Sequence, residues 1–249
     1  MPQNISINNL VIEVTRKCNM SCRHCLRGDA QNIDIDQQLI EETIKQCSDI
    51  SNITFTGGEP SLNTKALEFT LKTLKKYNKH INSFYVVTNA KKYNNAFVNV
   101  LNQYYMYCLS SEFNNLSIIE PTDVLPNIEN YEFDGGLAVS HDKYHDPIPA
   151  ANYLRYTMLK YYVHNKERLS DDYILDMGNA HKNKLGKFPC PISELHIDEY
   201  NNGCSIDMLY LNAKGDILAD CDLSYDEQPK HTYGNIINDS LIDIIERNR

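Results

Sequence analysis

Three cysteines stand close together near the start of the chain, at Cys18, Cys22 and Cys25. Cysteine thiolate is the usual ligand for iron–sulfur clusters and for structural zinc. Structural zinc takes four protein ligands, usually in two separated pairs, but no second pair follows here and His24 is wedged between ligands. A ferredoxin-type cluster takes four cysteines, and this spacing supplies three, which leaves one iron open to a small chelating molecule. The group therefore favours an iron–sulfur cluster over zinc.

A second group suited to ligand binding is TGGEP, at residues 56–60, directly after the run NITFT. The paired glycines, Gly57 and Gly58, allow the backbone to approach a ligand closely. The Glu59 carboxylate offers hydrogen-bond acceptors to a ligand, and Pro60 stiffens the exit of the loop. Such a run is also common in ordinary turns. Its position roughly 30 residues after the cysteines, one βα unit later, favours a shared site.

Alternating strand and helix patterns connect these groups. Apolar and β-branched runs predict strands at residues 10–14, 52–56, 83–88, 137–140 and 173–177. Helical patterns predict helices at residues 36–47, 63–79, 96–107 and 151–166, and no element is assigned from 110 to 136. About five or six such units are too few for a closed eight-stranded barrel. We therefore predict an α/β fold, a partial (β/α)6 TIM-like barrel over residues 1–180.

The character of the sequence changes after residue 180. Short alternating runs around Gly215 predict a β-hairpin, and a final helix is predicted to begin near Ser240. Residues 181–249 are therefore expected to form a small C-terminal extension made of a hairpin and a helix.

The composition is that of an ordinary globular protein, with 42% hydrophobic and 23% charged residues in 249. The formal net charge is −9, so the chain as a whole repels polyanions, which argues against a nucleic-acid partner. The sequence holds no run of about 20 apolar residues and no secretory signal pattern, so we expect a cytoplasmic protein without membrane contact. In that reducing compartment the eight cysteines are expected to be thiols or metal ligands rather than disulfides.

The cysteines and TGGEP together resemble the radical S-adenosylmethionine (SAM) superfamily, whose Cys-x3-Cys-x2-Cys motif follows the first strand of a partial (β/α)6 barrel. The resemblance implies that Cys18, Cys22 and Cys25 hold a 4Fe-4S cluster, and that SAM chelates the fourth iron. It implies that Gly57, Gly58 and Glu59 meet the methionyl ammonium. It also implies reductive cleavage of SAM to methionine and a 5′-deoxyadenosyl radical, which abstracts hydrogen from a substrate. A flavodoxin or ferredoxin would supply the electron.

Weaker matches to the family extend the predicted cofactor site. Thr88 and Asn89 in VVTNA resemble the end of its third strand and would border the cofactor, although Asn89 is equally suited to a turn cap. Ser140 and Asp142 resemble the Ser-x-Asp that faces SAM ribose or substrate, although Asp142 is equally suited to a helix cap. His24 departs from the family pattern, since the residue before the third cysteine is commonly Phe or Tyr and its backbone faces the adenine.

The tail resembles the twitch extension, a truncated form of the SPASM domain, of some radical SAM enzymes. That resemblance implies a second iron–sulfur cluster on Cys190, Cys204 and Cys221. Five residues rather than the usual four separate Gly215 from Cys221, and the later cysteines of a full SPASM domain are absent. The alternative is buried structural cysteine. A fourth ligand would come from His196, Asp222, another side chain or the substrate.

Extensions of this kind are frequent in enzymes that modify ribosomally made peptides. DMGNAH, from Asp176, is similar to a Met-Gly-Arg-Ala run in such enzymes, with Asn179 in place of Arg. The leading hypothesis is therefore a radical SAM enzyme acting on a peptide or protein side chain. A small metabolite or nucleotide is the alternative substrate. A non-catalytic iron–sulfur electron carrier or sensor is a further alternative, although such a protein has no use for GGEP. No catalytic residue acting on the substrate is assigned.

Overall fold

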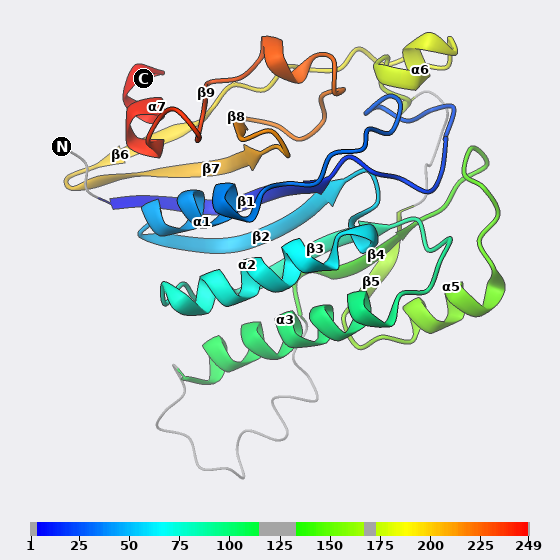
Figure 1. The fold of residues 1–249 in the computed structure, drawn as a ribbon, viewed down its shortest axis with the longest axis horizontal. Helices are drawn as coiled ribbons and strands as arrows, with labels where there is room; N and C mark the ends of the chain where they lie inside the picture. Colours follow the sequence, from blue (N-terminus) through cyan, green and yellow to red (C-terminus); the bar gives the residue numbers. More distant parts are fainter. Residues whose placement is uncertain (1–3, 115–132, 167–172, 249) are drawn as a thin grey trace.

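The computed structural model describes residues 4–114, 133–166 and 173–248, which build one nine-stranded sheet with helices packed on it (Figure 1). The strands are β1 (Asn4–Thr15), β2 (Asp49–Gly57), β3 (Ser83–Thr88), β4 (Gly136–Ser140), β5 (Tyr162–Lys166), β6 (Ile197–Tyr200), β7 (Gly203–Leu211), β8 (Asp216–Leu218) and β9 (Gly234–Asn235). Their order is β5-β4-β3-β2-β1-β7-β8-β9, with β6 paired to β7 off this path.

Every pair from β5 across to β7 is parallel, whereas β8, β9 and β6 are joined by antiparallel pairs. Within the described residues the two ends of the strand order do not pair with each other, so the sheet is open. The predicted α/β fold with a partial barrel is therefore confirmed. Predicted strands 10–14, 52–56, 83–88 and 137–140 fall in β1 to β4.

Helices cover one face of the parallel strands. These are α1 (Gln37–Gln46), α2 (Thr64–Lys76), α3 (Asn95–Asn114) and α5 (Ala150–Thr157), and the first three lie side by side in Figure 1. Asp36 begins α1 as predicted, because its side chain accepts a hydrogen bond from Gln38 N at 2.9 Å. Asn63 caps α2 in the same way. Among the described residues no helix is long and apolar enough to cross a membrane.

The two faces of the sheet carry different side chains, because successive residues of a strand point to opposite sides. On β3, Phe84 and Val86 are buried in the core beneath the helices. Tyr85 and Val87 are half-buried on the other face, as is Thr54 of β2. The face turned away from the helices is therefore accessible at this end of the sheet.

Two predictions for the segment after β4 were wrong. The helix predicted over residues 151–166 ends at Thr157, and Tyr162–Lys166 form β5, which pairs with β4. Its aromatic and β-branched residues favour a strand where an open edge is available. The strand predicted at residues 173–177 does not form, since Leu175 makes an isolated bridge to Phe188 and β5 already occupies the edge of β4. Of the segment without predicted elements, residues 115–132 lie outside the described residues.

The C-terminal segment continues the same sheet. Strand β7 runs parallel to β1, beginning with the pair Asn4 and Gly203. Strand β8 turns back on β7 to form the predicted hairpin, with Gly215 in the turn at a φ of +90° that favours glycine. The predicted final helix is α7 (Leu241–Arg247), and Ser240 caps its first turn.

Candidate functional site

A cavity of about 450 Å³ lies at the carboxyl ends of β1 to β4. Loops at these ends meet at one edge of a parallel sheet, which is where open α/β sheets bind ligands. The predicted residues that line the cavity are Cys18, Cys22, His24, Cys25, Gly57, Gly58, Glu59, Thr88, Asn89 and Ser140. Asp142 lies directly behind this lining, in contact with His24. The structure thus brings the predicted cofactor-binding group together.

The three cysteines share the loop after β1, and each is half-buried. Burial, followed by the negative charges of Cys25 and Cys18, raises the pKa of Cys22 to about 12. Burial likewise raises the pKa of Cys18. Thiolates that repel one another in a partly buried loop ionise together when a metal centre offsets their charge. This donor set fits a cluster held by three thiolates.

Gly57 and Gly58 bring the end of β2 against the start of the cysteine loop. A Cβ on Gly57 would lie 2.0 Å from the carbonyl oxygen of Thr15, and one on Gly58 would lie 2.3 Å from that of Lys17. Two backbone hydrogen bonds form there, from Gly58 N to Thr15 O and from Glu59 N to Lys17 O, each at 2.8 Å. The two glycines therefore allow the end of β2 to pack against the base of the cysteine loop. The sequence analysis had explained them by close approach to a ligand.

Glu59 is a buried carboxylate held at the ends of two strands. Its oxygens accept hydrogen bonds from Thr88 Oγ1 at 2.7 Å, Asn89 N at 2.8 Å and Ser61 N at 3.2 Å. Burial raises the pKa of Glu59 in spite of these donors. In the described part of the chain no cationic side chain pairs with it. A ligand ammonium in the cavity would supply the missing positive charge.

Asn89 links this carboxylate to the cysteine loop. Its Oδ1 accepts from Lys91 N at 3.0 Å, so the turn-capping role is present. Its Nδ2 donates to Asn19 Oδ1 at 2.8 Å and lies 3.8 Å from Cys18 Sγ. Asn19 Nδ2 is buried and has no hydrogen-bond partner among the described residues. An open donor beside Cys18 fits a loop that would hold a sulfur-rich group. No local pattern in the sequence pointed to Asn19.

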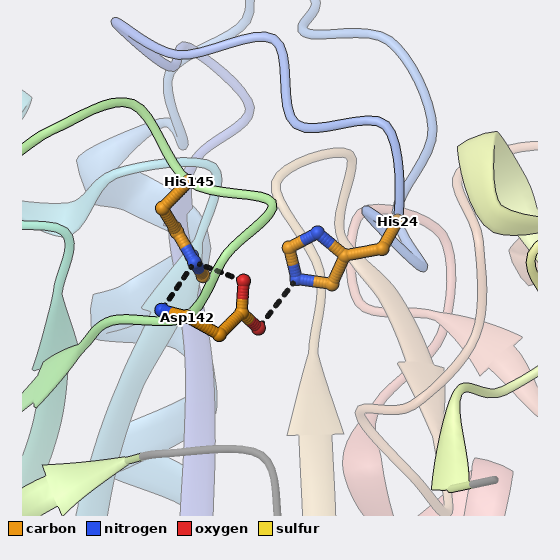
Figure 2. Close-up of side chains that lie close together, drawn as sticks. All are labelled: His24, Asp142 and His145. Carbon is orange, nitrogen blue, oxygen red and sulfur yellow. Dashed lines mark hydrogen bonds and ion pairs between the residues drawn. The ribbon is translucent and has the colours of Figure 1, made fainter. Parts of the chain in front are cut away.

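His24, Asp142 and His145 form a compact cluster at one wall of the cavity (Figure 2). Asp142 Oδ2 lies 3.3 Å from His24 Nε2, and its Oδ1 lies 2.9 Å from His145 Nδ1. Asp142 caps a turn by accepting from Tyr144 N at 2.8 Å and does not cap α5, whose N-cap is Pro149. Sequence reasoning missed His145, although it stands three residues after Asp142.

The comparison with protein families assigns the part of the chain that carries this site. Residues 12–104 match the model of the Radical SAM superfamily. They are a radical SAM domain. The match includes the three cysteines, the glycine pair and Glu59, so the predicted membership of this superfamily is confirmed for this part of the chain.

Other similarities are lower or shorter. An uncharacterized protein of Methanocaldococcus jannaschii is 34% identical over 65 residues, which are 25% of this chain and 23% of that protein. Streptococcus suis SuiB, solved bound to precursor peptide SuiA, is 13% identical, with 95% of this chain and 64% of SuiB covered and a TM-score of 0.43. The protein anSMEcpe, solved with bound AdoMet, is 12% identical, with 96% and 80% covered and a TM-score of 0.49. The chain thus spans under a quarter of the curated relative and under two thirds of SuiB.

DMGNAH packs directly on the cysteine loop of the radical SAM domain. Asn179 N donates to Cys25 O at 2.8 Å. Gly178 has a φ of +56°, and a Cβ there would lie 2.2 Å from Leu26 O. Both contacts use the backbone, so the replacement of Arg by Asn at 179 leaves them intact.

The structure separates the three tail cysteines. Cys190 Sγ lies 3.1 Å from the carbonyl oxygen of Asp222, and Cys221 lines the cavity. Cys204 is instead fully buried in the core, where it pairs with Ile5 at the amino end of β1. Roughly ten residues of strand, or about 30 Å, separate that end from the cysteine loop. The prediction that Cys204 shares a cluster with Cys190 and Cys221 is therefore corrected, because its side chain faces the hydrophobic core.

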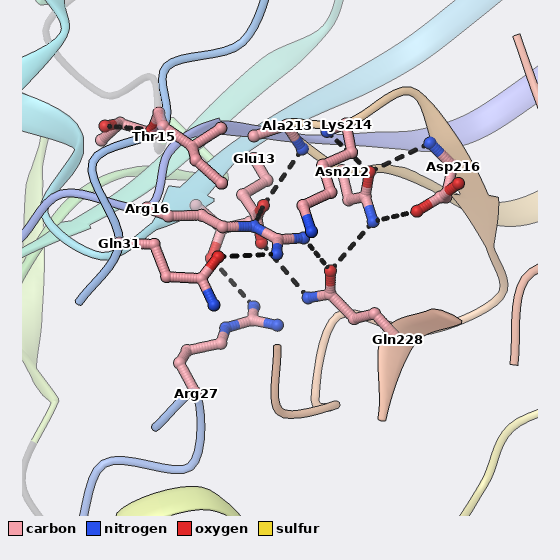
Figure 3. Close-up of polar contacts among 12 residues, drawn as sticks. Glu13, Thr15, Arg16, Arg27, Gln31, Asn212, Ala213, Lys214, Asp216 and Gln228 are labelled. Carbon is pink, nitrogen blue, oxygen red and sulfur yellow. Dashed lines mark hydrogen bonds and ion pairs between the residues drawn. The ribbon is translucent and has the colours of Figure 1, made fainter. Parts of the chain in front are cut away.

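A buried polar network ties the tail to the radical SAM domain (Figure 3). Arg16 Nε donates to Glu13 Oε1 at 2.6 Å, and a second nitrogen of Arg16 donates to Gln228. Gln228 Nε2 donates to Glu13 Oε2 at 3.2 Å, and the Tyr210 hydroxyl also donates to Glu13. Burial opposes ionisation of Glu13, but Arg27 and Arg16 outweigh it and hold its pKa below the usual value.

Arg27 extends this network to the cavity, which it lines. It donates to Leu223 O at 2.9 Å and to Thr56 Oγ1 at 3.3 Å, so one side chain joins the cysteine loop, β2 and the tail. Sequence reasoning missed Arg27 and Glu13, since their roles depend on residues about 200 positions away.

Proposed function

We propose that the chain is a radical SAM enzyme that cleaves S-adenosylmethionine reductively and uses the resulting 5′-deoxyadenosyl radical to abstract hydrogen from a substrate. The observation that carries this proposal is the convergence on one cavity of the three cysteines and of Glu59, a buried carboxylate without a cation. When bound, a 4Fe-4S cluster supplies the electron that cleaves the sulfonium bond. An external donor, a flavodoxin or ferredoxin, would reduce it.

The chain's own residues hold and orient these groups. Cys18, Cys22 and Cys25 would ligate three irons of the cluster. Glu59 would accept hydrogen bonds from the SAM ammonium, and the Thr88 hydroxyl and Asn89 amide hold the carboxylate in place for it. Ser140 and Asp142 would border the ribose, His24 the adenine, and Gly57 and Gly58 keep the cysteine loop seated against β2.

The test is anaerobic reconstitution with iron and sulfide, followed by dithionite and SAM. We expect release of 5′-deoxyadenosine, and loss of both iron and product in the variant with Cys18, Cys22 and Cys25 replaced by Ala. Cys108→Ala, which removes a thiol from α3 far from the loop, is the matched control and should retain both. An unchanged rate in the triple variant would contradict the proposal.

For the substrate, a peptide or protein side chain is the leading proposal. Its support is the cavity, which extends from the cysteine loop onto the accessible sheet face at Thr54, Tyr85 and Val87 and is bounded by Tyr173 and Leu175. A wall of this kind suits an extended, partly apolar chain entering from solvent. A small metabolite or nucleotide would fill the same space as the alternative.

Deuterium transfer distinguishes these substrates. Cells of the source organism are grown in heavy water so that candidate substrates carry deuterium. Their extract is separated by molecular size, and each fraction is incubated with the reduced enzyme and unlabelled SAM. Deuterium in 5′-deoxyadenosine from the larger fraction, lost after protease treatment, is expected for a peptide or protein. Transfer confined to the small-molecule fraction would favour the alternative.

A second cluster or metal group in the tail also stays a proposal, now with Cys190 and Cys221 as its cysteines. Asp220 and Asp222 stand beside Cys221 with ligand atoms within 4.8 Å of one another. The check is iron content. About four irons retained by the Cys18, Cys22 and Cys25 triple-Ala variant would support a tail cluster, and none in a folded protein would contradict it.

A further inference from the structure

The cluster of His24, Asp142 and His145 brings together side chains from two loops that lie far apart in the sequence (Figure 2). His24 belongs to the cysteine loop after β1, whereas Asp142 and His145 belong to the loop after β4. One ligand atom from each lies within 4.8 Å of the other two. On a zinc-type ion with bonds of about 2.0 to 2.1 Å, neighbouring ligand atoms stand roughly 3.3 Å apart. The spacing here is compatible with three bonds to one ion.

The cluster is sheltered from solvent. The exposed fractions of the side chains are 8% for His24, 11% for Asp142 and 9% for His145. Burial opposes ionisation of Asp142, but the Tyr144 amide and then the two imidazoles outweigh it and keep the pKa of Asp142 below its usual value. A carboxylate held between two sheltered imidazoles is a donor set that suits a transition-metal ion.

Neighbouring groups already orient the ligand atoms. The Ser140 hydroxyl lies 3.2 Å from Nε2 of His145, and Nδ1 of His145 faces Asp142, 3.2 Å from its backbone N and 2.9 Å from its Oδ1. The Tyr144 amide binds Oδ1 of Asp142, which leaves Oδ2 turned to His24. Partners of this kind, on the second nitrogen of a histidine and on a ligating carboxylate, are the usual surroundings of metal ligands in proteins.

We propose that His24, Asp142 and His145 bind a divalent transition-metal ion, separate from the iron–sulfur cluster. Two imidazoles and one carboxylate suit zinc, iron(II) or cobalt(II), whereas magnesium and calcium prefer oxygen ligands alone. Three protein ligands leave a coordination position open. His24 and His145 both line the cavity, so a small molecule bound there would lie near the ion.

The ion would act as a Lewis acid toward an oxygen of the bound molecule, such as a hydroxyl or carboxylate. It would also join the loop after β4 to the cysteine loop. Asp142 would then reach a ribose or substrate oxygen through the ion. This inference does not depend on the proposed SAM cleavage, since none of its ligands is a predicted ligand of the cluster.

The experiment uses untagged protein in which Cys18, Cys22 and Cys25 are Ala, so that loop thiols cannot bind the probe. Cobalt(II) is titrated anaerobically and followed by its d–d absorption. We expect one tight site without thiolate-to-metal charge transfer, displaced by zinc and not by magnesium. His145→Ala and His24→Phe, which keeps a planar ring, are each expected to weaken binding about 100-fold or more. The matched control is His141→Ala, an exposed histidine of the same loop, which should bind as before.

Three outcomes would overturn the proposal. Failure of the folded triple variant to bind cobalt would leave a hydrogen-bonded triad without an ion. Equal affinity in His145→Ala, verified as folded by circular dichroism, would place the ion elsewhere. A thiolate charge-transfer band lost in Cys221→Ser would assign it to the tail. Because the tested variant lacks the predicted cluster ligands, its result does not depend on whether the protein cleaves SAM.

Discussion

The carboxylate of Glu59, at the end of β2, accepts a hydrogen bond of 2.7 Å from the hydroxyl of Thr88, at the end of β3. This contact between the ends of two strands holds the buried Glu59 carboxylate in the lining of the cavity. Replacing Glu59 by Gln keeps the shape and removes the charge. We expect SAM affinity to fall about ten- to a hundred-fold, as for a lost charge-assisted hydrogen bond of about 1.5 to 3 kcal/mol. Equilibrium binding to the reconstituted protein measures this, with iron content unchanged; equal affinity would remove Glu59 from the ammonium site.

The same carboxylate predicts how stability depends on pH without ligand. The pKa of Glu59 is raised by burial in the folded state, so the native state holds its proton longer than the unfolded state. Its contribution to the free energy of unfolding is therefore full below the unfolded pKa of about 4.3, and is lost as pH rises through the raised value. Denaturant titrations across this pH range should show that the free energy of unfolding of the wild type declines as pH rises. The decline should be smaller in Glu59→Gln. Parallel curves for the two proteins would contradict it.

Gly58→Ala is expected to damage the cysteine loop. The added Cβ would lie 2.3 Å from the carbonyl oxygen of Lys17, and backbone must shift to relieve it. We expect a loss of about 1 to 3 kcal/mol in unfolding free energy and reduced iron loading. Gly28→Ala is the contrasting variant, because its Cβ would meet nothing closer than 3.9 Å although φ is +90°. Normal iron loading in Gly58→Ala would show that the loop tolerates the displacement.

Glu13→Gln is expected to destabilise the joint between tail and sheet. Glu13 is fully buried between Arg16 and Arg27, and removing its charge leaves buried cations without compensation. Breaking a buried ion pair in this way costs about 3 to 5 kcal/mol. Glu42→Gln, in an exposed pair with Lys45, is the matched control and should cost under about 1 kcal/mol. Chemical denaturation measures both, and similar losses would mean that the network adds little.

Local patterns in the sequence predicted the central site well, for a physical reason. The cysteine spacing and TGGEP each act within one loop, and both loops follow strands whose alternation is clear, so a parallel sheet places them together. The segment after β4 was harder, because residues 151–166 are rich in tyrosine, which suits helix and strand alike. The burial of Cys204 and the role of Arg27 depend on neighbours distant in the chain, as does the contact of His145 with His24. Spacing along the sequence carries no information about them.

The parallel pairing of β7 with β1 sets an order of events during synthesis. Asn4 pairs with Gly203, so about 200 further residues must be synthesised after the start of β1 before its partner β7 is available. Until then one edge of β1 is unpaired, and contacts this far apart in sequence form slowly. The cysteine loop begins where β1 ends, and its anchors in the tail, Leu223 and Gln228, emerge later still. Anchoring of the cysteine loop therefore waits for the tail, and a ribosome-bound fragment would expose both an open strand edge and the loop thiols.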